Sequence, residues 1–204
     1  MRPDPPSPLQ TTTSPVSIAI TGGIGAGKSS ALAAFARHGA ATASADEFVH
    51  RLLQEDPEVL QKLADRFGSE VLGPEGGADR EAIARIVFED PVELSWLEQL
   101  LHPKVIEAQA AWRDGLAARP DPPRVVVTEV PLLFETGGDE RFDVVIVITA
   151  SPEVRAARRP VADSREARLL SDEDKIRRAD FAYVNDGTLE ELDAFVAGVM
   201  SRLG

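Results

Sequence analysis

A glycine-rich loop that ends in Lys28-Ser29 contains the residues with the clearest chemistry in this chain. Its spacing from Gly22 to Ser29 is Gly-x-x-x-x-Gly-Lys-Ser, that of a phosphate-binding P-loop. The glycines allow a tight turn whose backbone N–H groups point at phosphates, the lysine reaches the terminal phosphates, and the serine hydroxyl holds Mg²⁺. The sequence therefore predicts a site for a nucleoside triphosphate and Mg²⁺, made of Gly22, Gly23, Gly25, Ala26, Gly27, Lys28, Ser29 and Ser30.

Two carboxylates stand where phosphoryl transfer needs acidic groups. Glu129 ends the buried run Arg124 to Val130 and could hold Mg²⁺ with Ser29, although an acid at a strand end is also common for structural reasons. Asp46 follows a short predicted strand, where it could remove or orient the proton of an attacking hydroxyl. The same position also suits a helix N-cap, so both interpretations of Asp46 stay open.

Arginines crowd the segment after the predicted strand Phe142 to Thr149. Such a segment can form a lid that closes on phosphates and excludes water, or a solvated face paired with nearby acids. Lys28 and a lid arginine, best Arg158, are predicted to be catalytic because they neutralise charge on the transferred group. The crowded arginines are Arg155, Arg158, Arg159, Arg165 and Arg168.

Composition limits the possible partners. The chain has 204 residues, 43% of them hydrophobic, which suits one domain or one core with a modest inserted subdomain. A net charge of −12 disfavours nucleic acid and anionic lipid as partners, and no apolar run approaches the ~20 residues that cross a bilayer. The absence of cysteine fits a cytoplasmic protein, and the three histidines are too scattered for a metal cluster. Small-molecule substrates are expected, whereas the oligomeric state is not set by the sequence.

Strands and helices alternate in a pattern that can position these residues. The pattern predicts a parallel α/β sheet flanked by helices, with ligands at the carboxyl ends of the strands. A Pro- and Ser-rich stretch, 1–15, is predicted to be a flexible tail, followed by a P-loop domain over 16–204. Strands are expected near 16–20, 40–45, 124–130, 142–149 and 182–184, and helices near 28–37, 47–54, 57–66, 79–89, 91–101, 103–116, from 152, from 172 to 178, and 188–203.

Several short motifs resemble those of the dephospho-CoA kinase family, in order, from about Val16 to the end. The Thr-Gly-Gly-Ile-Gly form of the loop together with Pro-Leu-Leu-Phe-Glu is specific to that family rather than to P-loop proteins at large. The matching segments are Thr21 to Ser30, Ala45-Asp46-Glu47, Asp79-Arg80, Leu101-His102-Pro103, Val130 to Glu135, Ala150-Ser151-Pro152, and Ala179-Asp180 with Asn185.

The resemblance implies a nucleoside-kinase-like fold and transfer of the ATP γ-phosphoryl group to the 3′-hydroxyl of dephospho-CoA. By the same resemblance, Asp46 is the acid that acts on this hydroxyl and Asn185 lies near the adenine of ATP. A helical block at about 55–119, with Arg80 and His102, corresponds to the subdomain that binds the acceptor, and a lid is expected at about 155–172.

Three departures from the family pattern leave other functions open. This chain has Ser44 and Glu129 where the family usually has aspartate, and Arg155 where it usually has glutamine. The third departure, in the lid, also includes the segment 159–170, which is shorter than usual, and a shorter lid should exclude water less well. The alternatives are a kinase for another small molecule or nucleotide on the same scaffold, and a nucleotide-binding relative with weakened catalysis.

Overall fold

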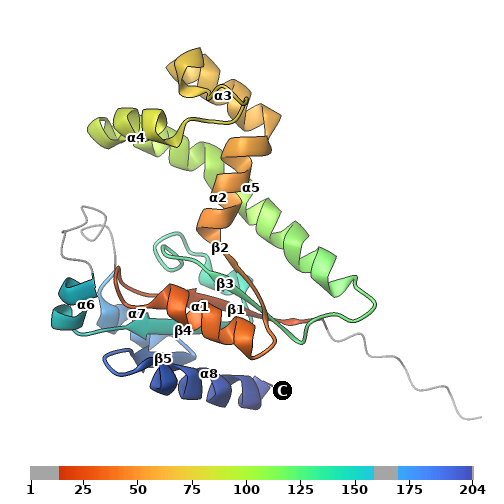
Figure 1. Cartoon of the computed structure of the whole chain (residues 1–204), viewed down its shortest axis with the longest axis vertical. Coiled ribbons are helices and arrows are strands. Elements are labelled where there is room, and N and C mark those ends of the chain that lie inside the picture. Colours follow the sequence, from red (N-terminus) through yellow and green to blue (C-terminus); the bar gives the residue numbers. More distant parts are fainter. Residues whose placement is uncertain (1–13, 159–169, 204) are drawn as a thin grey trace, which may run out of the picture.

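A parallel sheet forms the base of the molecule in the computed structural model, which describes residues 14–158 and 170–203 (Figure 1). Within these residues the sheet has five strands in the order β2-β3-β1-β4-β5, so β1 lies at the centre between β3 and β4. Most of the predicted tail and the middle of the predicted lid, with Arg159, Arg165 and Arg168, lie outside the described residues. The strands are β1 (Val16–Thr21), β2 (Ala41–Ser44), β3 (Val125–Glu129), β4 (Val144–Thr149) and β5 (Phe181–Val184).

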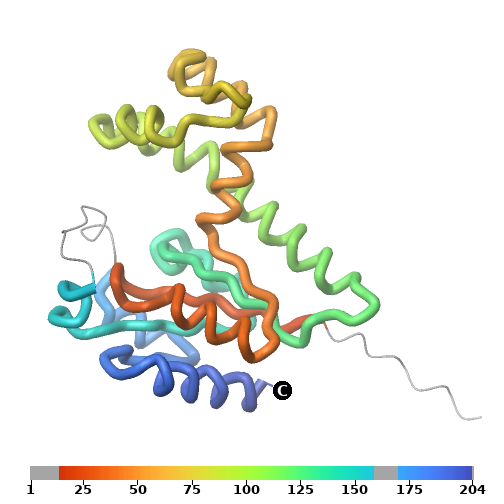
Figure 2. The backbone as a smooth tube through the Cα atoms, in the orientation of Figure 1, coloured from red at the N-terminus to blue at the C-terminus, as the bar shows by residue number. Residues whose placement is uncertain are grey.

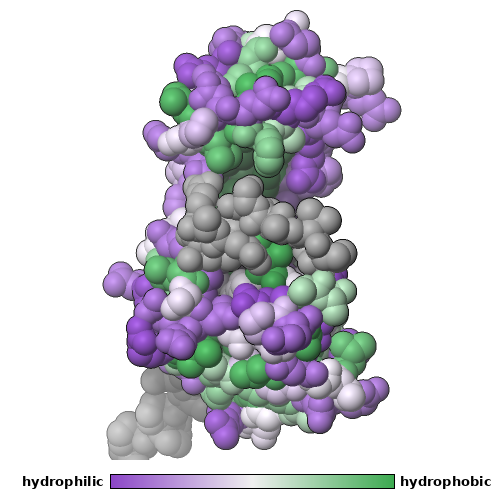
Figure 3. Space-filling view, turned by 90° about the vertical axis from the view of Figure 1, so that its left-hand side faces the viewer, coloured by the Kyte–Doolittle hydropathy of each residue, from purple (hydrophilic) through white to green (hydrophobic). Residues whose placement is uncertain are grey.

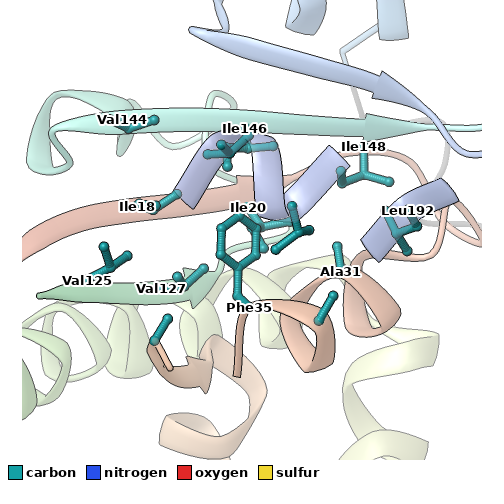
Figure 4. Close-up of a cluster of buried hydrophobic side chains, with 14 of the residues drawn as sticks. Ile18, Ile20, Ala31, Phe35, Val125, Val127, Val144, Ile146, Ile148 and Leu192 are labelled. Atoms are coloured by element: carbon teal, nitrogen blue, oxygen red, sulfur yellow. The ribbon is translucent and has the colours of Figure 1, made fainter. Parts of the chain in front are cut away.

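The central strands are buried on both faces, which explains their unbroken runs of β-branched residues. On one face, Ile18, Ile20 and Ile146 pack with Phe35 of α1 (Lys28–Arg37) and Leu192 of α8 (Leu189–Leu203), as Figure 4 shows. On the other face, alternate residues of the same strands pack against the segment that follows β3. These residues are Ala19, Val145 and Val147, in contact with Leu133 and Phe134.

Two short helices lie on the P-loop side of the sheet domain. They are α6 (Pro152–Arg158) and α7 (Asp172–Arg178), and they flank residues 159–169 in the sequence. Ser151 precedes α6, and the hydroxyl of Ser171 caps α7 by accepting a hydrogen bond from the Asp174 N–H at 3.1 Å. One-turn 3₁₀ helices occur at η1 (Ser69–Val71) and η2 (Asp139–Arg141).

A block of four helices rises from the sheet between β2 and β3 (Figures 1 and 2). Its helices are α2 (Ala45–Glu55), α3 (Pro57–Phe67), α4 (Arg80–Glu89) and α5 (Pro91–Ala117). The block has its own core, in which Val59, Leu63 and Val71 are fully buried with neighbours from α2, α4 and α5. In the space-filling view, hydrophilic side chains cover much of both the block and the sheet domain, in keeping with the high charge of the chain (Figure 3).

Helix α5 corrects one expectation from the sequence. Two helices were predicted on either side of His102-Pro103, but a single helix runs from Pro91 to Ala117 with Pro103 inside it. Proline removes a backbone N–H and usually ends or kinks a helix. Here the buried side chains of Leu101 and Val105, one turn apart, pack on both sides of Pro103 and hold the two halves in one helix.

Candidate active site

The P-loop connects β1 to α1 at the carboxyl edge of the sheet. Gly27 precedes α1 with φ 93°, and no side chain caps this end of the helix. The first N–H groups of α1 and of the loop are therefore directed at the position that an anion would take. Lys28 Nζ donates a hydrogen bond to the Gly23 carbonyl oxygen at 2.9 Å, which holds the ammonium over the loop.

Two glycines of the loop are required by close packing. A Cβ on Gly22, whose φ is 143°, would lie 1.9 Å from the carbonyl oxygen of Ile148 in β4. A Cβ on Gly27 would lie 2.2 Å from Nδ2 of Asn185. The buried Asn185 amide donates to the Ala26 carbonyl oxygen at 2.8 Å, so this residue supports the loop from behind.

Ser29 and Glu129 form a pair of hard oxygen donors beside the loop. The Ser29 hydroxyl donates to Glu129 Oε2 at 3.2 Å, and Glu129 is the last residue of β3, paired with Ile20 of β1. Burial raises the pKa of the Glu129 carboxyl, while the charge of Lys28 acts in the opposite direction. A hydroxyl and a carboxylate in contact fit the oxygen chemistry of Mg²⁺, which keeps several waters and takes further oxygens from phosphates.

Asp46 lies in the first turn of α2 and does not cap it. The cap is Ser44, whose hydroxyl accepts from the Glu47 N–H at 3.2 Å while the Glu47 carboxylate accepts from the Ser44 N–H at 3.3 Å. The N-cap interpretation of Asp46 is therefore wrong, and α2 begins at Ala45, two residues before the expected start at 47. The Ser-x-x-Glu pattern of a capping box was visible in the sequence and would have placed the helix start correctly.

A cavity of about 510 Å³ opens where the sheet meets the helical block. It brings together Asp46 and Arg80, which the sequence proposed, with His50, Arg51 and Trp112, which it did not single out. One signal in the sequence could have identified His50: it lies four residues after Asp46, and residues at that spacing share a face of a helix. Residues lining the cavity are Thr42, Ala43, Ser44, Asp46, Glu47, His50, Arg51, Arg80 and Trp112.

His102 does not join this cavity. It is exposed on α5 next to Pro103. A second cavity, of about 470 Å³, is lined by residues of α3 and α5 alone and contains none of the predicted site residues.

Two arginines of α6 lie against the P-loop. Arg158 donates to the Asn185 carbonyl oxygen at 2.9 Å and to the carbonyl oxygens of Gly25 and Ala26 at 3.4 Å. Arg155 forms an ion pair with Asp172 of α7 at 3.5 Å, and its guanidinium occupies the space that a Cβ on Gly23 would need. These contacts fix α6 at the loop and join it to α7.

A buried ion pair anchors α7 to the segment after β3. Lys175 is fully buried, and its Nζ lies 3.0 Å from Glu135 Oε1 without the alignment of a hydrogen bond. The Leu170 N–H donates to the same oxygen at 2.9 Å. This pair could not be predicted from the sequence, because α7 is charged along most of its length and no local pattern distinguishes Lys175 from its exposed neighbours.

The fold and this site together define a class of protein. A parallel sheet with a P-loop after its central strand, a hydroxyl and a carboxylate beside the loop, and a helical block across the carboxyl edge is the arrangement of a P-loop kinase. A solved structure supports this fold. Shikimate kinase from Aquifex aeolicus superposes with a TM-score of 0.50 at 14% identity, over 92% of this chain and 97% of that one. At this identity the likeness indicates a shared fold.

Comparison with known proteins identifies the family within this class. The family model of dephospho-CoA kinase matches residues 16–191, and the chain belongs to this family. Dephospho-CoA kinases from Syntrophotalea carbinolica and Thermobifida fusca are 35% and 36% identical to it, over 91% of this chain and 91% and 95% of theirs.

Two solved structures resemble the whole molecule. A structure from Thermus thermophilus superposes with a TM-score of 0.74 at 31% identity, over 94% of this chain and 100% of that one. Dephospho-CoA kinase from Campylobacter jejuni has the same fold, with a TM-score of 0.69 at 23% identity, over 94% and 99%. Among the residues described here, no helix is both long enough and apolar enough to cross a membrane.

Proposed function

We propose that this protein transfers the γ-phosphoryl group of ATP to the 3′-hydroxyl of dephospho-CoA, giving CoA and ADP. Family membership supports this reaction. The observation that carries it in the structure is the position of Asp46, on the wall of a cavity large enough for part of a nucleotide, next to the sheet edge that holds the P-loop. Ser44 pairs with Glu129 across β2 and β3, so the acceptor cavity and the phosphate site share that edge.

The P-loop is proposed to bind the triphosphate. Backbone N–H groups from Gly23 to Ser30 would surround the phosphates, and Lys28 would contact the terminal ones. Ser29 and Glu129 would hold Mg²⁺, and the ion would offset the negative charge that develops during transfer. Arg158 would supply a further cation at the nucleotide end of the site, and Asn185 would hold the loop in shape.

Asp46 is proposed to orient the acceptor hydroxyl and accept its proton. Its carboxylate is exposed at the cavity wall and is not used by the helix cap. A positioned carboxylate within reach of a hydroxyl contributes to transfer by removing or fixing that proton. Arg80 is proposed to bind the acceptor, whereas His102 is left out of this assignment because it does not line the cavity.

The proposal includes a cytoplasmic location and substrates that are small molecules. The chain has no cysteine and a net charge of −12, which fits an enzyme acting on free nucleotides rather than on nucleic acid or anionic lipid.

Product analysis tests the function directly. Purified protein with Mg²⁺ and ATP is assayed for ADP with and without dephospho-CoA, and CoA is identified by mass. We expect ADP that depends on the acceptor, with a matching amount of CoA. ADP without CoA would mean hydrolysis or a different acceptor, and ATP binding without ADP would favour a non-catalytic relative.

Lys28→Ala provides the matched control. Removal of the ammonium should abolish transfer with a small effect on folding, because Lys28 is half-buried and lies on the P-loop outside the hydrophobic cores. Circular dichroism and thermal unfolding check that the variant is folded. Full turnover in this variant would remove Lys28 from the mechanism.

A further inference from the structure

The lining of the acceptor cavity has a composition that the transfer reaction alone does not explain. Besides the carboxylates of Asp46 and Glu47 and the imidazole of His50, it contains one indole, from Trp112, and two guanidinium groups, from Arg51 and Arg80. A phosphoryl acceptor needs only its hydroxyl held near the carboxylate. An aromatic wall and two cations indicate that the cavity recognises a ligand with a flat ring and an anionic group as well.

Trp112 is placed to offer one face to a ligand. It lies on α5 and is half-buried, whereas Phe48 behind it is fully buried. The two rings meet edge to face, with centroids 6.0 Å apart and planes at 72°, so Phe48 fixes the indole from the core side. The rest of the indole lines the cavity, where a flat base could stack on it.

Arg51 and Arg80 approach the same cavity from two helices. The Arg51 guanidinium lies 4.6 Å from the centroid of the Phe48 ring, and Arg80 is the first residue of α4, whose N-cap is Asp79. Among residues 14–158 and 170–203, no carboxylate forms an ion pair with either guanidinium. In a chain of net charge −12, two such cations beside one cavity are suited to a diphosphate, which guanidinium groups bind in a bidentate manner.

We propose that Trp112 stacks on the adenine of the acceptor and that Arg51 and Arg80 bind its 5′-diphosphate. This places the adenosine 5′-diphosphate part of dephospho-CoA in the cavity, with its 3′-hydroxyl directed to Asp46. The inference rests on the proposed function and adds which half of the acceptor is recognised. Trp112 then determines specificity for an acceptor that carries adenine, Arg51 determines specificity for one that carries a diphosphate, and the pantetheine arm extends out of the cavity.

Steady-state kinetics separates this role from a structural one. Trp112→Ala should raise the KM for dephospho-CoA by about 10-fold to 100-fold, the range expected for loss of a base stack, with little change in kcat or in the KM for ATP. Trp112→Phe should recover most of the affinity. Trp96→Phe, which changes the other tryptophan of the same helix, should leave all three constants unchanged.

Fluorescence gives a readout that does not depend on turnover. In the Trp96→Phe protein, Trp112 is the remaining tryptophan, because the chain has two. Dephospho-CoA should quench its emission in a saturable way, whereas pantetheine 4′-phosphate, which lacks adenosine, and Mg-ATP should not. Saturable binding of dephospho-CoA by equilibrium dialysis with no change in this emission would overturn the assignment of Trp112.

Charge substitutions test the diphosphate contacts. Arg51→Gln and Arg80→Gln should each raise the KM for dephospho-CoA and weaken its dependence on salt, with the KM for ATP unchanged. The matched control is Lys62→Gln, since Lys62 is an exposed cation of α3 paired with Glu58. An unchanged KM in both arginine variants would place the diphosphate elsewhere.

The two proposals fail in different ways. If the wild-type protein forms no CoA, the proposed function is wrong. If it forms CoA while the Trp112→Ala variant has the wild-type KM for dephospho-CoA, the function stands and the recognition of adenine by Trp112 is wrong.

Discussion

Asp46 and Glu47 are neighbouring carboxylates with different tasks. Glu47 completes the capping box with Ser44 and so fixes the start of α2. Asp46 takes no part in these capping hydrogen bonds, and its carboxylate is exposed at the cavity wall. The capping box thus sets the direction of Asp46 while leaving its carboxylate available for the acceptor.

Asp46→Asn should lower kcat by about 10²-fold to 10⁴-fold, the usual contribution of a positioned acid or base. The amide keeps the size of the side chain but does not accept the proton, so ATP affinity should be unchanged. Glu47→Gln is the matched control, because glutamine also serves at that position of a capping box. Equal turnover in Asp46→Asn and the wild type would remove the proton-accepting role.

Glu129 makes Mg²⁺ binding sensitive to pH. Its pKa is raised by burial, so the carboxyl takes up a proton at a higher pH than an ordinary glutamate does. Since Mg²⁺ needs the ionised form, its contribution to ATP binding should fall as the pH drops through this raised pKa. Calorimetric titration of ATP with and without Mg²⁺ across that range measures the effect, and Glu129→Gln should remove the dependence on pH.

The metal-free protein should show the opposite trend in stability. A carboxyl whose pKa is higher in the folded than in the unfolded state contributes stability below its unfolded pKa, and this contribution is lost as the pH rises through the folded pKa. Glu129→Gln should therefore be more stable than the wild type near neutral pH in the absence of Mg²⁺. Thermal unfolding at two pH values checks the sign.

At the scale of elements, the buried pair of Lys175 and Glu135 joins α7 to the segment after β3. Lys175→Met should lower the free energy of unfolding by about 3–5 kcal/mol, because Glu135 would be left as a buried charge without its partner. The double variant Lys175→Met with Glu135→Gln should recover much of this loss. Urea unfolding gives these energies.

Arg177→Met is the control in the same helix. Its guanidinium is exposed and pairs with Asp174 on the surface, so its loss should change stability by no more than about 1 kcal/mol. If Lys175→Met has an equally small effect, the pair does not hold α7.

Local patterns predicted most elements of this fold, and tertiary contacts decided the rest. The P-loop could be predicted because all its residues lie in one continuous segment. The β-branched runs around Val127 and Ile146 correctly predicted buried strands. Pro103 gave the wrong helix boundary because packing by Leu101 and Val105 outweighs the local cost of proline. Trp112 was missed because nothing near it in sequence shows that α5 returns to the start of α2.

At the scale of the whole molecule, the acceptor cavity depends on how two cores are joined. The sheet and the helical block each have a core of their own. Phe48 packs between them with Ala43 of β2, Val105 of α5 and the indole of Trp112. These contacts of Phe48, called the join below, therefore link the sheet to the helical block and also form part of the cavity wall.

Phe48→Ala should affect both stability and acceptor binding. Truncation of this fully buried ring should cost about 3–5 kcal/mol and raise the KM for dephospho-CoA, with ATP affinity unchanged. Leu63→Ala is the matched control, because Leu63 is equally buried but lies in the core of the helical block, away from the cavity. It should lower stability without changing the KM. Equal KM values in the two variants would contradict a special role for the join.

The close approach of Gly22 to the Ile148 carbonyl changes how substitutions in the loop should be interpreted. If variants of the loop were compared by enzyme activity alone, substitutions of Gly22 and of Lys28 would give the same result, because both are expected to abolish activity. Their causes differ: a side chain at Gly22 would push β4 away from β1, so the variant would be lost to aggregation or proteolysis before it met ATP. Invariance at this glycine among natural relatives would therefore reflect selection for assembly of the sheet, independent of catalysis.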